Sequence, residues 1–425
     1  MTYDGEEKKR GLLALDNRRG IEEGISPRGA GMKAALDHSL QELEGGESIQ
    51  IESGETIFRL SSYGDNPILK PQDLRLTWYD RGERKIGAVF NGGAEIFQDK
   101  VILMPRCHRG YRKGTFFDET LGTERPCMED YVSEVWPLVS EDGIHFVRLH
   151  NTVIRGDGTD HHDFTHGIED IRIVKYGRRS VLVGCGKVKP PFKGGNADRI
   201  AVYATRDFVD ITYQGMVESF DSRNAVPFSE PVNGLHYVLL RFHPSIHLDC
   251  LEAGRDQLLH PSRHVRLWER IYERRSRNLI LEAGRYPHEN EKIGPGPQVI
   301  KTDRGWLVIY HAVGEIEDNI CEAYGLGEKI ERGYSICAAL LNLDDPREVL
   351  CRTRKPIYIP SAPYELHGDD RYPVDVPNVV FPVGAFVRKN RLVIYAGAGD
   401  KYVILLSCSL TNLVAYLWEH CKAGA

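Results

Sequence analysis

The 425-residue sequence has no apolar run near the ~20 residues that a membrane-spanning helix needs, so we expect no membrane association. It has no excess of basic charge, since 55 Lys and Arg residues stand against 61 Asp and Glu residues, and this argues against a nucleic-acid partner. Its first residues are charged rather than apolar, and its nine cysteines include no Cys-x-x-Cys pair. We therefore expect no secretory signal, free thiols and a cytoplasmic location.

The sequence also lacks a Pro-, Ser- or Gly-rich linker between about Val89 and Asn412, which favours one large body over residues 51–420. Residues 1–50 differ, because they are rich in Lys, Glu, Arg and Gly and poor in aromatic side chains. We expect a partly disordered or helical extension there, with an amphipathic helix from Met32 to Leu43. Such a helix would pack on the body or on another subunit, so a homo-oligomer is one expectation.

What the sequence does contain is a turn pattern of Ser or Thr, any residue, then Asp or Asn, which follows an apolar run and recurs along the chain. The Asp or Asn positions lie 65, 71, 67 and 67 residues apart, and the fourth copy is degenerate. This spacing predicts five units of one supersecondary element. The copies are Ser140–Asp142, Thr205–Asp207, Ser276–Asn278, Leu343–Asp345 and Leu410–Asn412.

Two further runs precede the turn in each unit, one rich in β-forming residues and, before it, one rich in small and polar residues. Several short strands in each repeat of this length predict an all-β, five-bladed propeller, with one large β-sandwich or barrel as the alternative. The β-forming runs are 101–104, 180–183, 237–240, 306–310 and 392–395. The polar runs are 89–93, 167–170, 225–230, 293–297 and 378–382.

In a propeller, the first strands crowd the central axis, so polar residues on these strands should converge on one cavity. The residues placed there are Asn91, Glu169, Asp170, Glu230 and Asn378. The densest cluster is Glu169-Asp170-Ile171-Arg172, where strand alternation puts Asp170 and Arg172 on one face and Glu169 on the other. A carboxylate with a cation two residues away suits catalysis, although a structural salt bridge explains the pair equally well.

Two more groups of side chains bear on the chemistry. Aromatic rings in a funnel suit sugar recognition, and basic residues in or beside the inner strands would form a phosphate site if they converge. The aromatic candidates, each of which also fits a core position, are Trp306, Tyr310, His311, Tyr334 and Tyr395. The basic candidates are Arg106, Arg109, Arg199, Arg223, Arg241 and His243. We predict no metal, because His161-His162-Asp163 and His166 lack a known set of ligands around them and fit a polar loop.

Eight motifs in order between Asn66 and Ser407 resemble those of glycoside hydrolase family 130, which comprises β-mannoside phosphorylases and related β-mannosidases. The resemblance implies a five-bladed propeller, which agrees with the number of units inferred from the spacing. The motifs are Asn66–Leu69, Val89–Ala94, Gly167–Arg172, Lys292–Pro297, Gly305–His311, Leu340–Pro346, Asn378–Pro382 and Tyr395–Asp400.

By this resemblance, Asp170 matches the family's general acid, which protonates the glycosidic oxygen indirectly through a sugar hydroxyl. Inorganic phosphate, as co-substrate, then attacks the anomeric carbon from the opposite face and gives α-mannose 1-phosphate, so no cofactor is implied. The implied phosphate ligands are Arg106, Arg199, Arg223, Arg241 and His243. The implied substrate ligands, for a β-mannoside or manno-oligosaccharide, are Asn91, Glu169, Arg172, Glu230, Lys292, His311, Tyr334 and Asp400.

The sequence departs from the family pattern at several positions. Ile171 replaces a proline, Arg223 stands where a lysine is usual, and Arg241 with His243 reverses the usual His-Arg order. The insertion Lys187–Asp198 is also unexpected. Two alternatives stay open, namely a β-mannosidase of the same fold and a sugar-binding propeller without catalysis.

Overall fold

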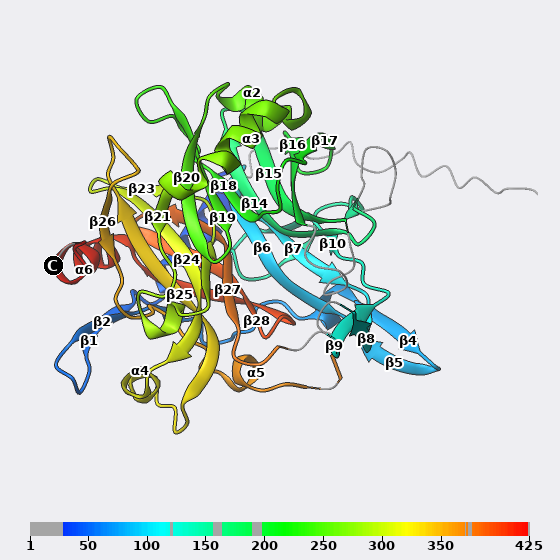
Figure 1. Cartoon of the computed structure of the whole chain (residues 1–425). Helices are drawn as coiled ribbons and strands as arrows, with labels where there is room; N and C mark the ends of the chain where they lie inside the picture. Colours follow the sequence, from blue (N-terminus) through cyan, green and yellow to red (C-terminus); the bar gives the residue numbers. More distant parts are fainter. Residues whose placement is uncertain are drawn as a thin grey trace, which may run out of the picture.

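The computed structural model describes residues 29–119, 122–155, 164–188, 198–369, 371–372 and 376–423. Antiparallel strands are the predominant secondary structure of these residues, and the helices are few and short, as Figure 1 shows. The expectation of an all-β chain is therefore confirmed. Within the described ranges, none of the helices has the length and apolar character that crossing a membrane requires.

Five larger sheets follow one another along the chain. The first contains β6 (Ala88–Phe97), β7 (Lys100–His108), β10 (Glu134–Val135), β11 (Leu138–Ser140), β12 (Val147–Arg148) and β13 (Ile154–Arg155). The second contains β14 (Ile168–Tyr176), β15 (Arg179–Lys187), β16 (Asp198–Thr205) and β17 (Ile211–Val217). The third contains β18 (Arg223–Pro227), β19 (His236–Phe242), β20 (Ser245–Leu251) and β21 (Leu279–Leu281).

The last two sheets complete the body. The fourth contains β22 (Lys292–Pro295), β23 (Ile300–Lys301), β24 (Trp306–Ile316), β25 (Ile330–Leu341) and β26 (Val349–Arg352). The fifth contains β27 (Val380–Arg388), β28 (Arg391–Ala398), β29 (Tyr402–Ser409) and, from much earlier in the sequence, β3 (Ser61–Ser62). The five polar runs of the sequence fall on the first strands of these sheets and the five β-forming runs fall on the second strands, so this part of the repeat is confirmed.

The repeated turn is only partly as expected. Ser140 ends β11 and Thr205 ends β16, and each hydroxyl accepts hydrogen bonds from backbone amides of the turn that follows. In the fifth sheet the equivalent residue is Ser409, which caps helix α6 (Leu410–His420), whereas Leu410–Asn412 lies inside that helix. In the third sheet, 276–278 precedes β21 instead of following β20. Helices between β20 and β21 separate the residues that match the turn pattern from the end of β20.

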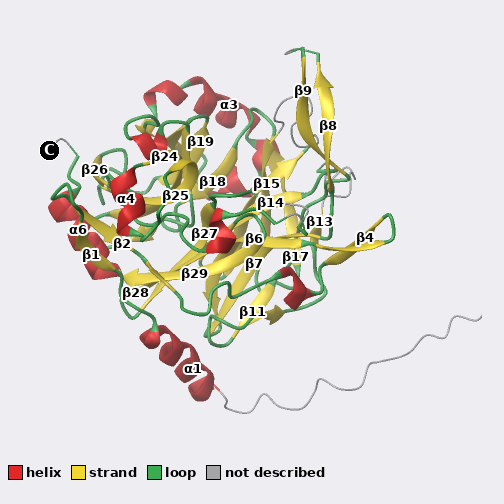
Figure 2. Ribbon diagram, turned by 90° about the horizontal axis from the view of Figure 1, so that it is seen from below, coloured by secondary structure: helices red, strands yellow, loops and turns green. Residues whose placement is uncertain are grey.

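The hydrophobic core is divided among the sheets. Four of the five largest clusters of buried residues lie between two sheets that are consecutive in the chain, and the other joins the fifth sheet to the first. Strand β6 also contacts both β14 and β27, and β14 contacts β18. Seen from below in Figure 2, these first strands lie near the middle of the molecule and helices α1, α3 and α6 lie at its periphery.

The segment that begins with β3 lies along the last sheet. Ser61 and Ser62 pair with Ser407 and Leu406 of β29. The Asn66 side chain then both donates to and accepts from the backbone of Leu405, and the backbone of Leu69 pairs with that of Val403. Residues 61–69 therefore supply the outer edge of the sheet to which β29 belongs.

Helices cover parts of this β body. Helix α1 (Gly29–Glu42) accounts for the helix expected over Met32–Leu43, and its Leu36 and Leu40 are buried against the first and fifth sheets. Residues 1–28 lie outside the described residues, so the division into an extension, 1–50, and a body, 51–420, stays a prediction. The other helices are α2 (Arg255–Leu259), α3 (Val265–Glu273), α4 (Asp318–Ala323) and α5 (Pro363–Leu366).

Three two-stranded hairpins stand apart from the five sheets. The first pairs β1 (Glu47–Gln50) with β2 (Thr56–Arg59). The other two, β4 (Thr77–Asp80) with β5 (Glu83–Ile86) and β8 (Arg112–Asp118) with β9 (Thr123–Glu129), extend from the lower right of the body in Figure 1.

Candidate active site

A cavity of about 440 Å³ lies where the first strands of the sheets meet. It contains ten of the fourteen residues that the sequence predicted for the site, namely Asn91, Arg106, Glu169, Asp170, Arg223, Arg241, His243, Lys292, Tyr334 and Asp400. Its other lining residues are Met128, Tyr131, Lys187, Asn224, Arg332, Val376, Val379 and Phe381.

A repeated backbone irregularity points polar side chains into this cavity. The pairing of the first strand with the second slips in sheets one, two and three, immediately beside Asn91, Asp170 and Asn224 respectively. All three residues have positive φ angles of 51–54°, which Asn and Asp tolerate better than most residues. A β-bulge of this kind re-aims a side chain. It explains why Glu169 and Asp170 both line the cavity, although a regular strand would have placed them on opposite faces.

Asp170 is held on three sides by polar groups. Asn91 Nδ2 donates a hydrogen bond of 3.0 Å to Asp170 Oδ1. The guanidinium nitrogens of Arg106 and Arg223 lie 3.6 and 3.7 Å from the two carboxylate oxygens. The carboxylate is buried, yet it reaches the cavity. This placement gives a fixed acid or base whose charge two cations can balance.

The carboxylate of Glu169 binds neighbouring side chains and is not free to bind a ligand. It accepts hydrogen bonds from Tyr131 Oη and Arg223 Nη2, and Arg106 Nη2 lies 3.1 Å from its Oε1. Burial alone would raise the pKa of Glu169, but the two guanidinium groups outweigh that effect and lower the pKa well below its usual range. Burial likewise opposes the charge on Arg106, but Glu169 and Asp170 raise the pKa of Arg106 above its usual value. Glu169 therefore stays ionised and holds both arginines in place.

Three further basic residues, Arg241, His243 and Lys292, line the cavity, and none of them forms an ion pair with another described residue. Arg241 sits beside Arg223 in the register of β18 and β19, and its buried Nε has no hydrogen-bond partner among the described residues. Burial, followed by the charge of Arg223, lowers the pKa of Arg241. The same two causes, burial and then a neighbouring cation, here Arg241, lower the pKa of His243. Lys292 Nζ lies 5.3 Å from the centroid of the Tyr334 ring. These three residues, which we call the unpaired basic residues, are suited to bind an anion.

Asp400 completes the charged part of the cavity from the turn between β28 and β29. Its φ angle is 53°, and burial raises its pKa to about 6, helped by the neighbouring charges of Asp170 and Glu169 and opposed by Arg106. A carboxyl group with this pKa exchanges its proton near neutral pH. It can accept hydrogen bonds from sugar hydroxyls in its ionised form and donate one in its protonated form.

Four predicted residues are not brought into the cavity, and two of them face solvent. The side chain of Asp198 turns toward Arg223 in the site. Because neighbouring residues of a strand point to opposite faces, the side chain of Arg199 points away from the cavity and forms an ion pair with Asp221. Glu230 pairs with Lys301 at 3.1 Å and lies three residues beyond the end of β18, away from the inner strand.

The other two, Arg172 and His311, are buried behind the cavity wall. Arg172 donates to the backbone carbonyls of Asp170, Pro295 and Gly296 at 2.7, 3.1 and 3.0 Å, so it ties β14 to β22 instead of facing a ligand. His311 packs against Phe381, with ring centroids 4.3 Å apart. Burial, followed by the charge of Arg241, holds the pKa of His311 well below its usual range.

The remaining sequence candidates have structural roles. Trp306, Tyr310 and Tyr395 are buried in the core, and Tyr395 Oη donates to the carbonyl of Gly143 at 2.7 Å. Arg109 is largely exposed and lies 3.8 Å from Glu134. The interpretation of Trp306, Tyr310 and Tyr395 as core residues was therefore correct.

Several lining residues escaped the sequence reasoning. Asn224 could have been found, because it follows Arg223 at the place in the first strand where Asp170 follows Glu169. Lys187 ends β15 and forms a buried ion pair with Asp198, its partner across the strands. Tyr131 lies in the connection after β9, outside the repeat, and no sequence signal marked it.

Among the described residues, one group could hold a metal ion, and it lies outside this cavity. His288, Glu289 and Cys337 are all buried and close together. Glu289, however, already binds Arg352 at 2.5 Å and accepts from Tyr310 Oη at 2.9 Å, which places a cation where a metal would need to be. The pair His161-His162 and Asp163 lies outside the described residues, so the expectation of no metal stays a prediction.

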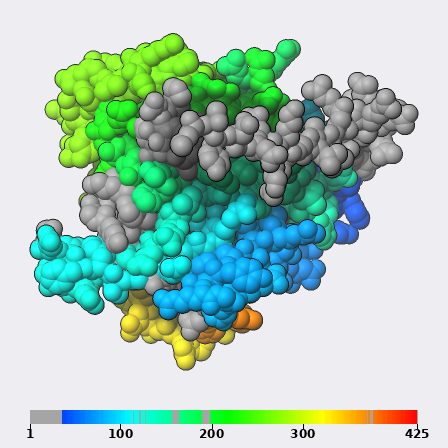
Figure 3. All heavy atoms as spheres, turned by 90° about the vertical axis from the view of Figure 1, so that its right-hand side faces the viewer, coloured from blue at the N-terminus to red at the C-terminus, as the bar shows by residue number. Residues whose placement is uncertain are grey.

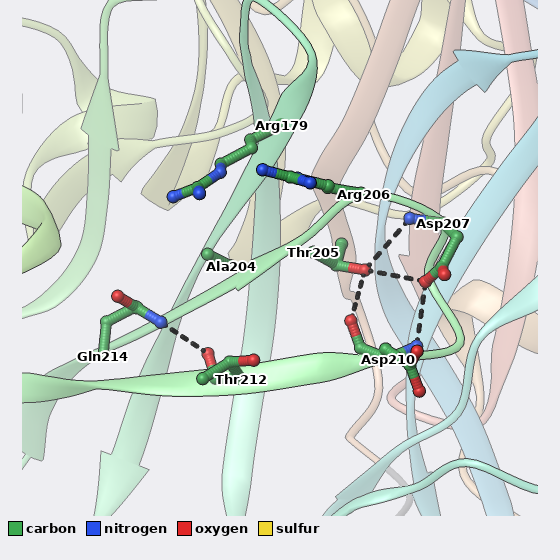
Figure 4. A pocket seen from close by; sticks show the side chains of 8 residues that line it. All are labelled: Arg179, Ala204, Thr205, Arg206, Asp207, Asp210, Thr212 and Gln214. Atoms are coloured by element: carbon green, nitrogen blue, oxygen red, sulfur yellow. Dashed lines mark hydrogen bonds between the residues drawn. The ribbon is translucent and has the colours of Figure 1, made fainter.

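A second cavity, of about 360 Å³, lies at the other end of the second sheet (Figure 4). The guanidinium groups of Arg179 and Arg206 extend over it, and Asp207 accepts hydrogen bonds within its own turn. It contains none of the predicted site residues. Because Arg179 begins β15 and Lys187 ends it, this cavity is separated from the candidate active site by the length of that strand.

Comparisons with known proteins identify the chain's relatives. The family described as beta-1,4-mannooligosaccharide phosphorylase, glycoside hydrolase family 130, matches residues 65–419. A 1,2-beta-oligomannan phosphorylase of Thermoanaerobacter sp. (strain X514) is 27% identical over 72% of this chain and 93% of its own. A beta-1,2-mannobiose phosphorylase of Listeria innocua serovar 6a is 28% identical over 85% of this chain and 99% of its own.

The fold agrees with this assignment. The solved structure of beta-1,2-mannobiose phosphorylase from Listeria innocua, in complex with beta-1,2-mannobiose, superimposes with a TM-score of 0.61 at 22% identity, covering 84% of this chain and 99% of that one. The ordered motifs, the family match over most of the chain and the shared fold lead to one conclusion, that this chain belongs to glycoside hydrolase family 130.

Proposed function

We propose that this chain is an inverting β-mannoside phosphorylase, which cleaves a β-mannosidic bond in a mannoside or manno-oligosaccharide with inorganic phosphate and releases α-mannose 1-phosphate. The single observation that carries the proposal is that the unpaired basic residues line the same cavity as Asp170. The relatives, which are named as phosphorylases of mannosides, support the same reaction class.

Asp170 is the proposed general acid. Its proton passes through a sugar hydroxyl to the departing glycosidic oxygen while the bond between that oxygen and the anomeric carbon breaks. The charge left on Asp170 is then balanced by the guanidinium groups of Arg106 and Arg223 and by the hydrogen bond from Asn91. General acid catalysis requires a carboxyl group held in a fixed position, which the bulge at Asp170 supplies.

Phosphate is the proposed nucleophile, and Arg241, His243 and Lys292 are its proposed ligands. A buried cation without a partner is costly, and a phosphate dianion would compensate it through charge-assisted hydrogen bonds. One phosphate oxygen forms the new bond to the anomeric carbon on the face opposite the leaving group, so the configuration inverts. Arg223 contributes less than expected from the sequence, because Glu169 and Asp198 already engage it. Arg106 is engaged by Glu169 in the same way.

The mannosyl unit is proposed to lie between Asp170 and Asp400 and to contact Asn91 of β6 and Asn224 of β18. Asn224 Oδ1 and Asn91 Oδ1 are buried acceptors without a partner among the described residues, which is an arrangement that sugar hydroxyls would satisfy. Tyr334 and Phe381 give the cavity one aromatic wall. Hydroxyl acceptors on one side and flat apolar rings on the other suit a pyranose.

We further propose that the five sheets are the blades of a five-bladed propeller around this cavity. The circular order of the core clusters and the pairing of β3 with β29 support that arrangement. A cytoplasmic location is proposed as well, because all nine cysteines are free and free thiols suit a reducing compartment. No cofactor besides the phosphate co-substrate enters the proposed reaction.

Incubation with a panel of β-linked mannosides, with and without phosphate, tests the proposal. The expected products are α-mannose 1-phosphate and the shortened sugar, formed only when phosphate is present. Free mannose released at the same rate in phosphate-free buffer would instead identify a β-mannosidase. No turnover of any mannoside in either buffer would favour a sugar-binding protein.

A further inference from the structure

His108, which has no part in the reaction as described above, is buried beside the candidate active site. It ends β7 two residues after Arg106, and alternate residues of a strand share one face. Its imidazole lies among the rings of Phe90, Tyr111 and Tyr131, with ring centroids 5.8, 5.4 and 4.9 Å away. Packing alone would account for an imidazole among aromatic rings, but both of its ring nitrogens have polar partners.

These two hydrogen bonds fix the tautomer of the imidazole. Arg106 Nε lies 2.9 Å from His108 Nε2, and a guanidinium has only donors, so His108 Nε2 accepts and carries no proton. His108 Nδ1 then carries the proton of the neutral ring and donates it to the carbonyl oxygen of Val132, 3.1 Å away. Burial, followed by the charge of Arg106, holds the pKa of His108 well below its usual range, so the ring stays neutral.

The bond from His108 determines how the guanidinium of Arg106 is oriented. Arg106 Nη1 lies 3.6 Å from Asp170 Oδ1, whereas Nη2 lies 3.1 Å from Glu169 Oε1 and donates to Tyr131 Oη. Because the N–H groups of a guanidinium lie in one plane with fixed directions, an acceptor on Nε sets the directions of both Nη groups. Glu169 and Tyr131 hold Nη2 alone, so His108 supplies the further contact that keeps Nη1 directed at Asp170.

We propose that His108 is a positioning residue, which fixes the guanidinium of Arg106 against Asp170 and so places the positive charge that balances Asp170 once its proton has left. This role rests on the proposed function, in which Asp170 is the general acid. His108 does not line the cavity, so it acts through Arg106 and not on the substrate. A neutral acceptor suits the role, because a carboxylate at this position would compete with Asp170 for the charge of Arg106.

The position of the imidazole depends in turn on the connection between β9 and β10. Tyr131 and Val132 lie in this connection, just after the β8–β9 hairpin, whose residues protrude in cyan at the left of Figure 3. The Val132 carbonyl accepts the proton of His108 Nδ1, and the Tyr131 ring packs against the imidazole. The path of a surface connection is therefore coupled to Asp170 through His108 and Arg106.

Two substitutions separate this positioning role from packing. His108→Phe keeps a ring among the other rings but has no acceptor for Arg106 Nε. His108→Gln loses the ring but can place its amide oxygen near the position of Nε2. We expect kcat for phosphorolysis to fall on the order of 10²-fold in His108→Phe, as for a reacting group misplaced by about 1 Å, and to fall much less in His108→Gln. The reverse order of the two kcat values is what packing alone would give, and it would overturn the proposal.

The Michaelis constants and a matched variant provide the controls. The KM for phosphate should change far less than kcat in both variants, because the unpaired basic residues are untouched, and an equally large change in KM would contradict the proposal. His247→Phe makes the same substitution at another buried histidine, which packs against Phe242 outside the cavity, and it should leave kcat unchanged. Circular dichroism and thermal unfolding of each variant show whether it is folded.

NMR of the full chain labelled with ¹⁵N-histidine tests the tautomer without any turnover. The signals of His108, identified by their loss in His108→Gln, should show Nδ1 protonated and Nε2 unprotonated from about pH 5 to 8. The other tautomer, or a ring that becomes charged in this range, would overturn the proposal even if the variants fail to fold. A wild type with the expected tautomer but no phosphorolysis would refute the proposed function and the positioning role with it. An active wild type with the reverse order of the variants would refute the positioning role alone.

Discussion

Replacing Asp170 by Asn should abolish most of the turnover while leaving the fold intact. Asn tolerates the positive φ of 51° at this bulge, and its amide oxygen can still accept the hydrogen bond from Asn91. What it cannot do is give a proton to the departing oxygen. General acid catalysis contributes about 10²–10⁴-fold, so kcat should fall by that factor, which corresponds to ~3–5 kcal/mol in the barrier.

The leaving group provides the decisive assay. A dinitrophenyl β-mannoside departs without protonation, so the loss caused by Asp170→Asn should shrink with that substrate and stay large with mannobiose. Asp207→Asn makes the same chemical change in a turn of the same sheet, outside the cavity, and should leave both rates unchanged. Equal losses of Asp170→Asn with the two substrates would show that Asp170 acts on the structure of the site rather than as the acid.

Three further changes test other parts of the site. Arg241→Ala should raise the KM for phosphate about 10- to 150-fold, the equivalent of one charged hydrogen bond of ~1.5–3 kcal/mol, and change the KM for the mannoside far less. Comparable increases in both KM values would argue against a phosphate ligand. Asp400→Asn should stabilise the protein, because a carboxyl whose pKa is raised from 3.8 to about 6 disfavours folding once it ionises. The gain in thermal midpoint over the wild type should be full above pH 6 and vanish below pH 4, and a constant gain would contradict this assignment. Gly397→Ala should destabilise the protein by about 1–3 kcal/mol and slow turnover, because a Cβ there collides with Asn91 Oδ1. Gly64→Ala, whose Cβ meets nothing within 4 Å, is the matched control, and equal thermal midpoints for the two variants would refute the argument.

Much of the fold could be predicted because the strands repeat. The polar and β-forming runs identified the first and second strands of all five sheets, including β6 with Asn91 and β14 with Asp170. Side chains on consecutive first strands converge in such an arrangement, so ten predicted residues reached the cavity. The turn pattern was less reliable, because a Ser or Thr hydroxyl can accept hydrogen bonds from backbone amides in a turn after a strand and also at the start of a helix, as Ser409 does. The same sequence pattern therefore fits both structures.

The parts of the site that could not be predicted depend on side-chain direction and on loops. Alternation along a regular strand predicted that Glu169 and Asp170 point to opposite faces. The bulge between Glu169 and Arg172 breaks this alternation, so both carboxylates line the cavity. Arg199 was assigned by its position in the family pattern, but its neighbour Asp198 is the one that turns toward Lys187 and Arg223. Tyr131 comes from a connection whose path no repeat constrains.

The pairing of β3 with β29 has a consequence for how the chain acquires its structure. Ser62 and Leu406 are neighbours in one sheet, yet more than three hundred residues of sequence separate them. Contacts between residues so distant in the chain form slowly, because the entropy of closing the intervening loop opposes them. During synthesis on the ribosome, β3 emerges early and must wait for nearly the whole chain before its partner exists. The fifth sheet is therefore expected to form last, and a chain cut after the fourth sheet should expose an apolar surface that binds chaperones.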